Sequence, residues 1–168
     1  MRYLITFLTI TTLLTSNFSF GQNSKNYSYL IDCFKNSSTE KGERTINGIG
    51  NVEEIALSSN ELNETGILYF EIPKNKKGKS LVKLAELVTN DYIITWKNNS
   101  KVLLNQKYEN TNACIIDLRL HIKIENIYMQ VIVINDGEKI YQIMCFRDTA
   151  DENYFNSLID KIKEQNCL

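Results

Sequence analysis

The chain has 168 residues, of which 43% are hydrophobic, and its formal net charge at pH 7 is −1. This balance argues against a nucleic-acid partner, because neutralising a phosphate backbone requires clustered positive charge. With one proline and seven glycines, the composition is typical of a globular protein rather than a disordered one.

The N-terminus has the parts of an export signal. Arg2 precedes a short apolar run, Leu4–Leu14, and small residues lead up to Gly21. The run is shorter than the roughly 20 residues that a membrane-spanning helix needs. We therefore expect a signal peptide over residues 1–21 and a single α+β domain over residues 22–168. The protein is then periplasmic or secreted, with no integral membrane span after cleavage.

The first part of the mature chain, residues 22–66, is poorly defined by its sequence. Tyr29–Phe34 fits either a strand or a helical turn, and the polar stretch Lys35–Gly50 is expected to be a loop. Periodicity becomes clearer at Ile67–Ile72, which predicts a strand that stops at Pro73.

A helix is expected over about residues 81–90. Ser80 is a suitable N-cap, and the apolar residues that follow recur at intervals of three and four. Tyr92–Trp96 and Lys101–Leu104 are predicted strands, joined through the polar segment Lys97–Ser100.

The C-terminal half predicts a three-stranded antiparallel meander over about residues 112–147. From Ile116 to Ile124 apolar and polar residues alternate, which indicates a strand with one buried and one polar face. Ile127–Ile134 is apolar at nearly every position, as expected for a strand covered on both faces. Lys139–Arg147 is the third strand.

Two turns and a final helix complete the predicted elements. Glu125-Asn126 fits a tight turn, and Asp136-Gly137 fits a type I′ hairpin. A helix is expected over about residues 150–165, because Thr149 and Glu152 match a capping box. Its apolar stripe consists of Tyr154, Phe155, Leu158, Ile159 and Ile162.

These elements predict an α+β fold. A central strand that is apolar on both sides requires cover on both faces of the sheet. We expect the helix at about 81–90 to cover one face and the helix at about 150–165 to cover the other.

The mature chain keeps four cysteines: Cys33, Cys114, Cys145 and Cys167. Export permits disulfides, and four cysteines allow three pairings. The turns place Cys114 and Cys145 near opposite ends of the sheet, beyond the roughly 7 Å Cα separation that a disulfide tolerates. Cys33 and Cys167 lie near the two ends of the mature chain, and we predict that they pair. No C-x-x-C spacing supports a zinc or thioredoxin-like site.

His121 is the only histidine. It is a candidate general base, since its pKa lies near neutrality. The sequence nominates no acid to orient it, and a solvated residue on the polar face of a strand is the alternative. We predict no metal and no cofactor.

A mixed basic and aromatic patch is the candidate interaction face. If the turns set the register literally, one sheet face carries Arg119, His121, Lys123, Tyr128, Gln130 and Tyr141. Such a patch suits an acidic or peptide ligand. The alternative is that a helix covers the apolar part of this face and water covers the rest.

Four lysines, at positions 74, 76, 77 and 79, precede Ser80. A phosphate or anionic-lipid contact is one interpretation, and a solvated loop is the other. The spacing does not match a P-loop.

The order of elements resembles the PsbP/DcrB-like superfamily over about residues 67–165. The matching segments are Phe70–Pro73, Ser80–Ala85, Gly137–Ile143 and Phe155–Ile162. Members of that superfamily are mostly exported or membrane-associated, and several act as adaptors or chaperones. The resemblance implies an accessory role and transfers no functional residue.

Three functions are therefore considered. The first is an exported, non-enzymatic binding protein that contacts a protein or peptide partner through its sheet face or rim. The second is an immunity or inhibitor protein for a secreted toxin. The third is a small hydrolase, which requires His121 to contact an acid and to lie near a Ser, Thr or Cys nucleophile.

Overall fold

The computed structural model describes residues 27, 29–32, 38–58, 65–109 and 112–165. The predicted signal peptide and the predicted Cys33–Cys167 pair therefore lie outside the described residues.

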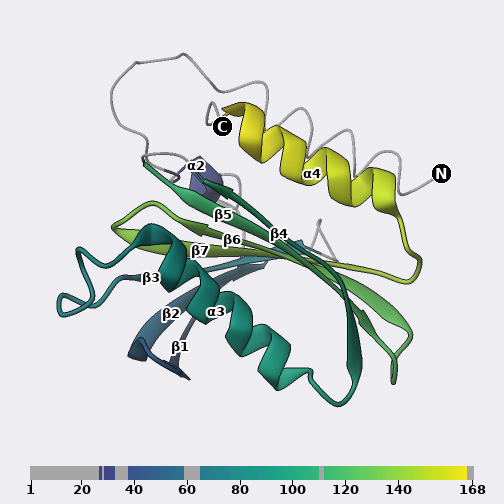
Figure 1. The fold of residues 1–168 in the computed structure, drawn as a ribbon, viewed down its shortest axis with the longest axis horizontal. Helices are drawn as coiled ribbons and strands as arrows, with labels where there is room; N and C mark the ends of the chain where they lie inside the picture. Colours follow the sequence, from purple (N-terminus) through teal and green to yellow (C-terminus); the bar gives the residue numbers. More distant parts are fainter. Residues whose placement is uncertain (1–26, 28, 33–37, 59–64, 110–111, 166–168) are drawn as a thin grey trace.

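Seven antiparallel strands form one sheet in the order β1-β2-β3-β7-β6-β5-β4 (Figure 1). The strands are β1 Ser38–Ile46, β2 Gly50–Ser58, β3 Thr65–Glu71, β4 Ser100–Glu109, β5 Cys114–Ile122, β6 Ile127–Asn135 and β7 Lys139–Arg147. The predicted α+β class, the antiparallel sheet and the interior position of the strand beginning at Ile127 are confirmed.

The predicted meander is formed by β5, β6 and β7, but each pairing is offset by two residues from the one that its predicted two-residue turn sets. An even offset leaves every side chain on the predicted face of the sheet. Ile122 pairs with Ile127, and Asn135 pairs with Ile140. At the second turn Asp136 N donates to Lys139 O, so the two loop residues are Gly137 and Glu138. Gly137 has a φ of 90°, and Asp136 Oδ1 accepts hydrogen bonds from Glu138 N and Lys139 N. Only Gly137 in this turn has a positive φ, which fits a type II′ turn rather than the expected type I′.

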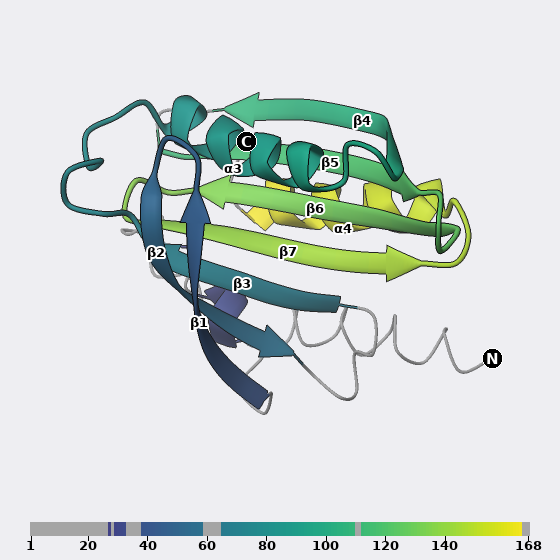
Figure 2. The same ribbon diagram turned by 90° about the horizontal axis from the view of Figure 1, so that it is seen from below.

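Helix α3, Leu81–Thr95, packs on one face of the sheet over β5 and β6 (Figure 2). The Ser80 hydroxyl accepts a hydrogen bond from Lys83 N at 3.4 Å, as its capping role predicts. The strand expected at Tyr92–Trp96 is wrong, because α3 continues through Thr95. Tyr92 follows Val88 on the same buried stripe, so helical packing outweighs the local β propensity.

The expected loop over Lys35–Gly50 is also wrong, because Ser38–Ile46 forms β1 and pairs along its length with β2. Eight of its nine residues are not fully buried, so no apolar alternation marks it in the sequence. Upstream, α2, Tyr29–Asp32, is the helical turn that was one of two options for that region.

Helix α4, Glu152–Gln165, lies on the side of the sheet opposite α3 (Figures 1 and 2). Ile159 and Ile162 are buried in a hydrophobic cluster with β-strand residues that include Ile132 and Tyr141. Leu30 in α2 and Tyr27 just before it belong to the same cluster.

The N-terminus of α4 is capped two residues later than expected. Asp151 Oδ1 accepts a hydrogen bond from Tyr154 N at 3.0 Å, and the Glu152 carboxylate contacts Arg119. The Thr149 carbonyl oxygen accepts a hydrogen bond from Asp151 N. The Thr149–Glu152 capping box is therefore wrong, and the cap is Asp151.

Replacing each candidate cap by alanine should show which of the two residues caps α4. Asp151→Ala removes an acceptor for a free helix amide, and we expect it to lower the free energy of unfolding by about 0.5–2 kcal/mol. Thr149→Ala should change it by less than about 0.5 kcal/mol. Urea denaturation of both variants measures the difference, and a larger loss for Thr149→Ala would contradict the assigned cap.

Candidate functional site

A row of polar side chains crosses the sheet on the α4 side. Arg119 on β5 pairs with Gln130 on β6, Gln130 with Cys145 on β7, and Cys145 with Thr65 on β3. Residues opposite one another in antiparallel strands project from the same face. We refer to Thr65, Arg119, Gln130 and Cys145 as the polar row.

Arg119 joins the sheet to α4. Its guanidinium is buried and donates to Asp117 Oδ2 from Nε at 3.1 Å and from Nη2 at 2.7 Å. It also donates to Glu152 Oε2 at 2.5 Å and to Asn156 Oδ1 at 2.8 Å. Its Cζ lies 5.5 Å from the centre of the Phe155 ring. Three acceptors from two elements therefore fix this cation.

Gln130 extends the same network. Its Nε2 donates to Asp117 Oδ1 at 2.9 Å and to the Phe155 carbonyl at 3.1 Å. Both oxygens of the buried Asp117 carboxylate thus accept hydrogen bonds. Among the side chains that the structure describes, Gln130 Oε1 is the one buried polar atom without a partner. Leaving such an acceptor unpaired costs about 1–3 kcal/mol.

Cys145 lies between Gln130 and Thr65 in the row and has Tyr154 on α4 as a further neighbour. Burial raises the pKa of the Cys145 thiol to about 11, and hydrogen bonds with Tyr154 and Thr65 offset only part of that shift. Burial likewise raises the pKa of Tyr154 to about 12, and the Arg147 guanidinium lies 3.8 Å from its ring centre. A thiol held neutral at physiological pH is a poor nucleophile.

On the same face of the sheet, His121 and Tyr128 form the next cross-strand pair toward the β5–β6 turn. Their rings stack with centroids 4.5 Å apart and planes 8° from parallel. The His121 Nε2 atom is 3.0 Å from Asn126 Oδ1. The hydrolase hypothesis required an acid at His121, whereas the neighbour in hydrogen-bonding distance is a neutral amide.

The six residues of the predicted interaction face are not equivalent. Arg119, Gln130 and Tyr141 are buried, so the expectation of a solvent-facing patch is wrong for these three. The same holds for the polar face expected on β5, since α4 lies over Asp117 and Arg119. His121 and Tyr128 are half-exposed, and Lys123 lies in the turn beyond β5.

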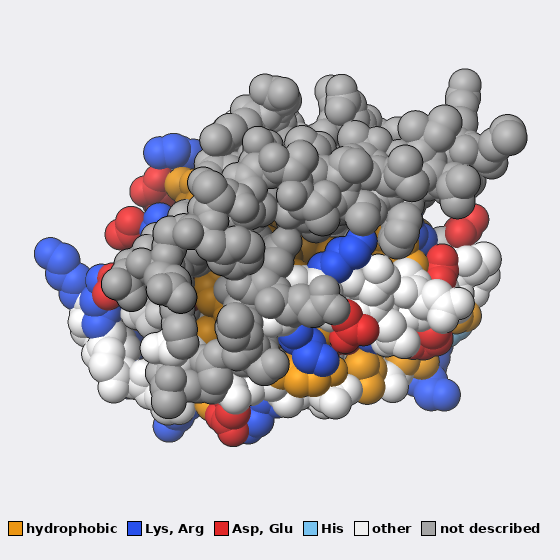
Figure 3. All heavy atoms as spheres, turned by 90° about the horizontal axis from the view of Figure 1, so that it is seen from above, with side chains coloured by type: hydrophobic (Ala, Val, Ile, Leu, Met, Phe, Trp, Pro, Cys, Tyr) orange, Lys and Arg blue, Asp and Glu red, His pale blue; other side chains and the backbone are white. Residues whose placement is uncertain are grey.

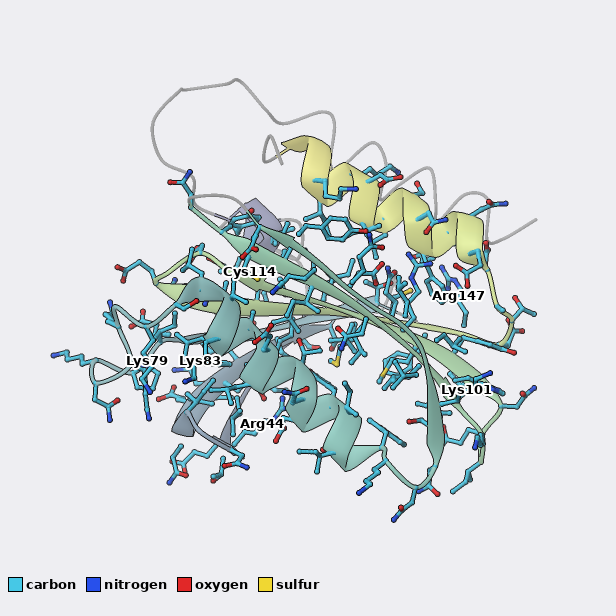
Figure 4. The ribbon with its side chains drawn as sticks, viewed as in Figure 1. Arg44, Lys79, Lys83, Lys101, Cys114 and Arg147 are labelled. Atoms are coloured by element: carbon cyan, nitrogen blue, oxygen red, sulfur yellow. The ribbon has the colours of Figure 1, made fainter. Side chains whose placement is uncertain are left out.

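A second polar cluster lies on the α3 side (Figure 4). Arg44 on β1 donates to Asp91 on α3 at 2.5 Å and to Gln142 at 3.1 Å. Burial by itself lowers the pKa of Arg44, but the hydrogen bond to Asp91 contributes to a larger opposite effect, so its pKa is raised. Tyr92 and Glu54 complete the cluster through Gln142. No pattern in the sequence predicted this cluster, because the segment that forms β1 was expected to be a loop.

Exposed hydrophobic side chains gather at one end of the sheet. Ile94 is 62% exposed, Ile124 73%, Val102 42% and Leu103 39%. A hydrogen bond from Lys123 N to Asn99 O, 2.7 Å long, joins the β5–β6 turn to the turn between α3 and β4. These four residues lie at the end of the sheet where the two turns meet. We refer to this surface, which consists of Ile94, Val102, Leu103 and Ile124, as the turn end.

Lysines surround the turn end: Lys97, Lys101 and Lys123 are all exposed. Figure 4 shows Lys101 at the same end of the molecule as Arg147, with Cys114 and Lys79 at the other. Viewed from the α4 side, described side chains of both charges lie beside hydrophobic ones at the margin of the molecule (Figure 3).

The structure also describes the lysine-rich segment and two of the four cysteines. The lysine-rich segment before Ser80 is a loop, in which Lys77 pairs with Glu138. Cys114 and Cys145 are both buried free thiols. Within the described ranges no three His, Cys, Asp or Glu side chains are grouped to hold a metal ion, and no helix there has the length and apolarity to span a membrane.

Removing only one partner of the Arg119–Asp117 ion pair should lower the free energy of unfolding strongly. We expect Arg119→Met to lower the free energy of unfolding by about 3–5 kcal/mol, because it leaves the buried Asp117 carboxylate uncompensated. Adding Asp117→Leu should recover part of that loss. Urea denaturation of the single and double variants tests this, with Glu152→Gln, at the exposed end of the network, expected to cost below about 1 kcal/mol. A double variant less stable than Arg119→Met contradicts the assignment.

The two buried thiols should react slowly below pH 9. Burial raises the pKa of each, Cys114 and Cys145, from 9.0 to about 11. The unfolded chain therefore loses these protons first, and stability should fall as pH rises from 9 to 11. Peptide mass spectrometry after iodoacetamide treatment measures the reaction at each site. Labelling of native Cys145 at pH 8 as fast as in denaturant contradicts the prediction.

Comparison with known proteins gives this chain no family. No protein-family model matches it, and no curated protein matches it. The PsbP/DcrB-like resemblance therefore stays a prediction drawn from the sequence.

Proposed function

We propose that the chain is an exported, non-enzymatic binding protein that contacts a protein or peptide partner through the rim of its sheet. In this proposal α3 and α4 close the two faces of the sheet, as a helix-sheet-helix sandwich. Recognition then falls to the turn end. The exposure of four large hydrophobic residues there is the observation that carries the proposal.

The buried polar groups support a structural role for the interior. Arg119 is held by Asp117, Glu152 and Asn156, so its charge is already neutralised. The raised pKa of Cys145 disfavours thiolate chemistry at the same row. In this proposal these groups hold α4 in position on the sheet and do not act as reactive groups.

The turn end has the composition of a contact surface. Single exposed hydrophobic residues are normal on soluble proteins, but a group of them marks interaction sites. Ile124 stands at the tip of the β5–β6 turn, and the stacked His121–Tyr128 pair lies immediately behind it. Aromatic residues beside an apolar centre are typical of protein interfaces.

Export is supported by the sequence of residues 1–21. An apolar run of that length behind Arg2 is typical of a secretory signal. The partner in this proposal is met outside the cytoplasm.

Substituting the tip of the turn tests the role of the turn end. We expect Ile124→Asp to weaken capture of a partner from the native envelope fraction by about tenfold, which corresponds to about 1.4 kcal/mol. Asn75→Asp adds the same charge in the loop at the other end and should leave capture unchanged. Quantitative mass spectrometry of the eluates compares both variants with the native chain, and circular dichroism confirms their folding. Equal recovery with Ile124→Asp, or no specific protein with the native chain, would sink the proposal.

A further inference from the structure

The sheet has two edges, and they differ in chemistry. β1 and β4 are the outermost strands, each paired on one side (Figure 2). The other side of an edge strand presents backbone N–H and C=O groups that can pair with an added strand. Which edge accepts a partner therefore depends on the side chains around it.

The β1 edge has the features that discourage pairing. It carries mixed charges within a short span, and Lys41 is tied to Glu53 at 3.3 Å. Arg44 is engaged by Asp91 on α3. No large hydrophobic side chain of β1 is exposed; its one such residue, Ile46, is buried. Charged side chains on an edge protect it from association.

The β4 edge is different at its beginning. Val102 and Leu103 are exposed there, and exposed apolar groups on an edge strand are a liability unless something covers them. The pairing of β4 with β5 shifts between Val102 and Leu104, so a bulge interrupts the strand. A partner strand is thereby confined to the short segment that starts at Ser100.

The charged side chains around residues 100–103 indicate the chemistry of a strand that pairs there. Lys101 is exposed on β4, and Lys97 and Lys123 flank it from the neighbouring turns. The next basic residue along the strand, Lys107, already has a partner in Glu86 on α3, 3.4 Å away. Three cations beside apolar side chains favour an acidic partner. A second copy of this chain is disfavoured, because a two-fold contact brings the same lysines together.

We propose that β4 binds an extended segment of the partner, acidic and apolar in alternation, as an added strand beside residues 100–103. Main-chain hydrogen bonds supply affinity in this mode, and alternate side chains supply specificity. Val102 and Leu103 meet the apolar side chains of the segment, and Lys101 meets its carboxylates. This inference rests on the proposed binding function and names its surface and partner chemistry.

Two synthetic peptides with blocked ends test the inference on the full mature chain. One alternates Glu and Val, and the other alternates Lys and Val at the same length. We expect the acidic peptide to bind, to slow hydrogen exchange of β4 amides in NMR spectra, and to lose affinity as salt rises. The basic peptide should leave the spectra unchanged.

Matched charge reversals locate the site. Lys101→Glu should weaken the acidic peptide by about tenfold, since attraction becomes repulsion. Lys41→Glu reverses an exposed lysine on the opposite edge and should have no effect. Equal weakening by both variants, binding of both peptides alike, or protection confined to β1 overturns strand addition at β4.

The remaining outcomes separate the two proposals. If envelope capture depends on Ile124 while the acidic peptide leaves β4 amides unprotected, strand addition fails and the binding function stands. If sedimentation shows a dimer with protected β4 amides and no peptide bound, the partner is a second copy and the acidic-segment inference fails.

Discussion

The interior strand β6 imposes the main constraint on this molecule. Apart from Gln130 and Asn135, its buried side chains are apolar on both faces, so both faces of the sheet must be kept from water around it. On one face α3 supplies Leu84, Ala85 and Val88. On the other, α4 supplies Ile159 and Ile162. The interior is thereby filled mainly by hydrophobic packing, with the buried Asp117, Arg119 and Gln130 as the polar exception on the α4 side.

The polar row shows a different principle on the α4 face. An apolar stripe by itself defines poorly where a helix sits along a sheet, because hydrophobic contact is non-directional. Arg119 adds direction: its planar guanidinium requires acceptors at fixed angles, and Glu152 and Asn156 supply them from the first turns of α4. Burying this cation with Asp117 adds little net stability. Its contribution is the position of the helix over β5.

The two edges of the sheet differ in the side chains that surround them. β4 is an edge strand whose start meets the last turn of α3 and the β5–β6 turn. Val102 and Leu103 are exposed there, and the nearby Lys97, Lys101 and Lys123 are exposed as well. On the β1 edge, by contrast, Lys41 pairs with Glu53 and Arg44 pairs with Asp91. The β1 edge thus exposes no large hydrophobic side chain, whereas the β4 edge exposes Val102 and Leu103.

The sequence by itself determined the elements whose signals are local. Alternation and turn residues determined that β5, β6 and β7 form a meander and which face each side chain takes, although both pairings are offset by two residues from the predicted turns. Ser80 and the apolar stripe after it determined the start of α3. Only the tertiary structure decided that β1 is a strand, because its residues are polar and its order comes from pairing with β2. Only the tertiary structure decided that Arg119 is buried, since an alternating strand has the same pattern whether water or a helix meets its polar face. Long-range packing decides burial, and no short window of sequence contains it.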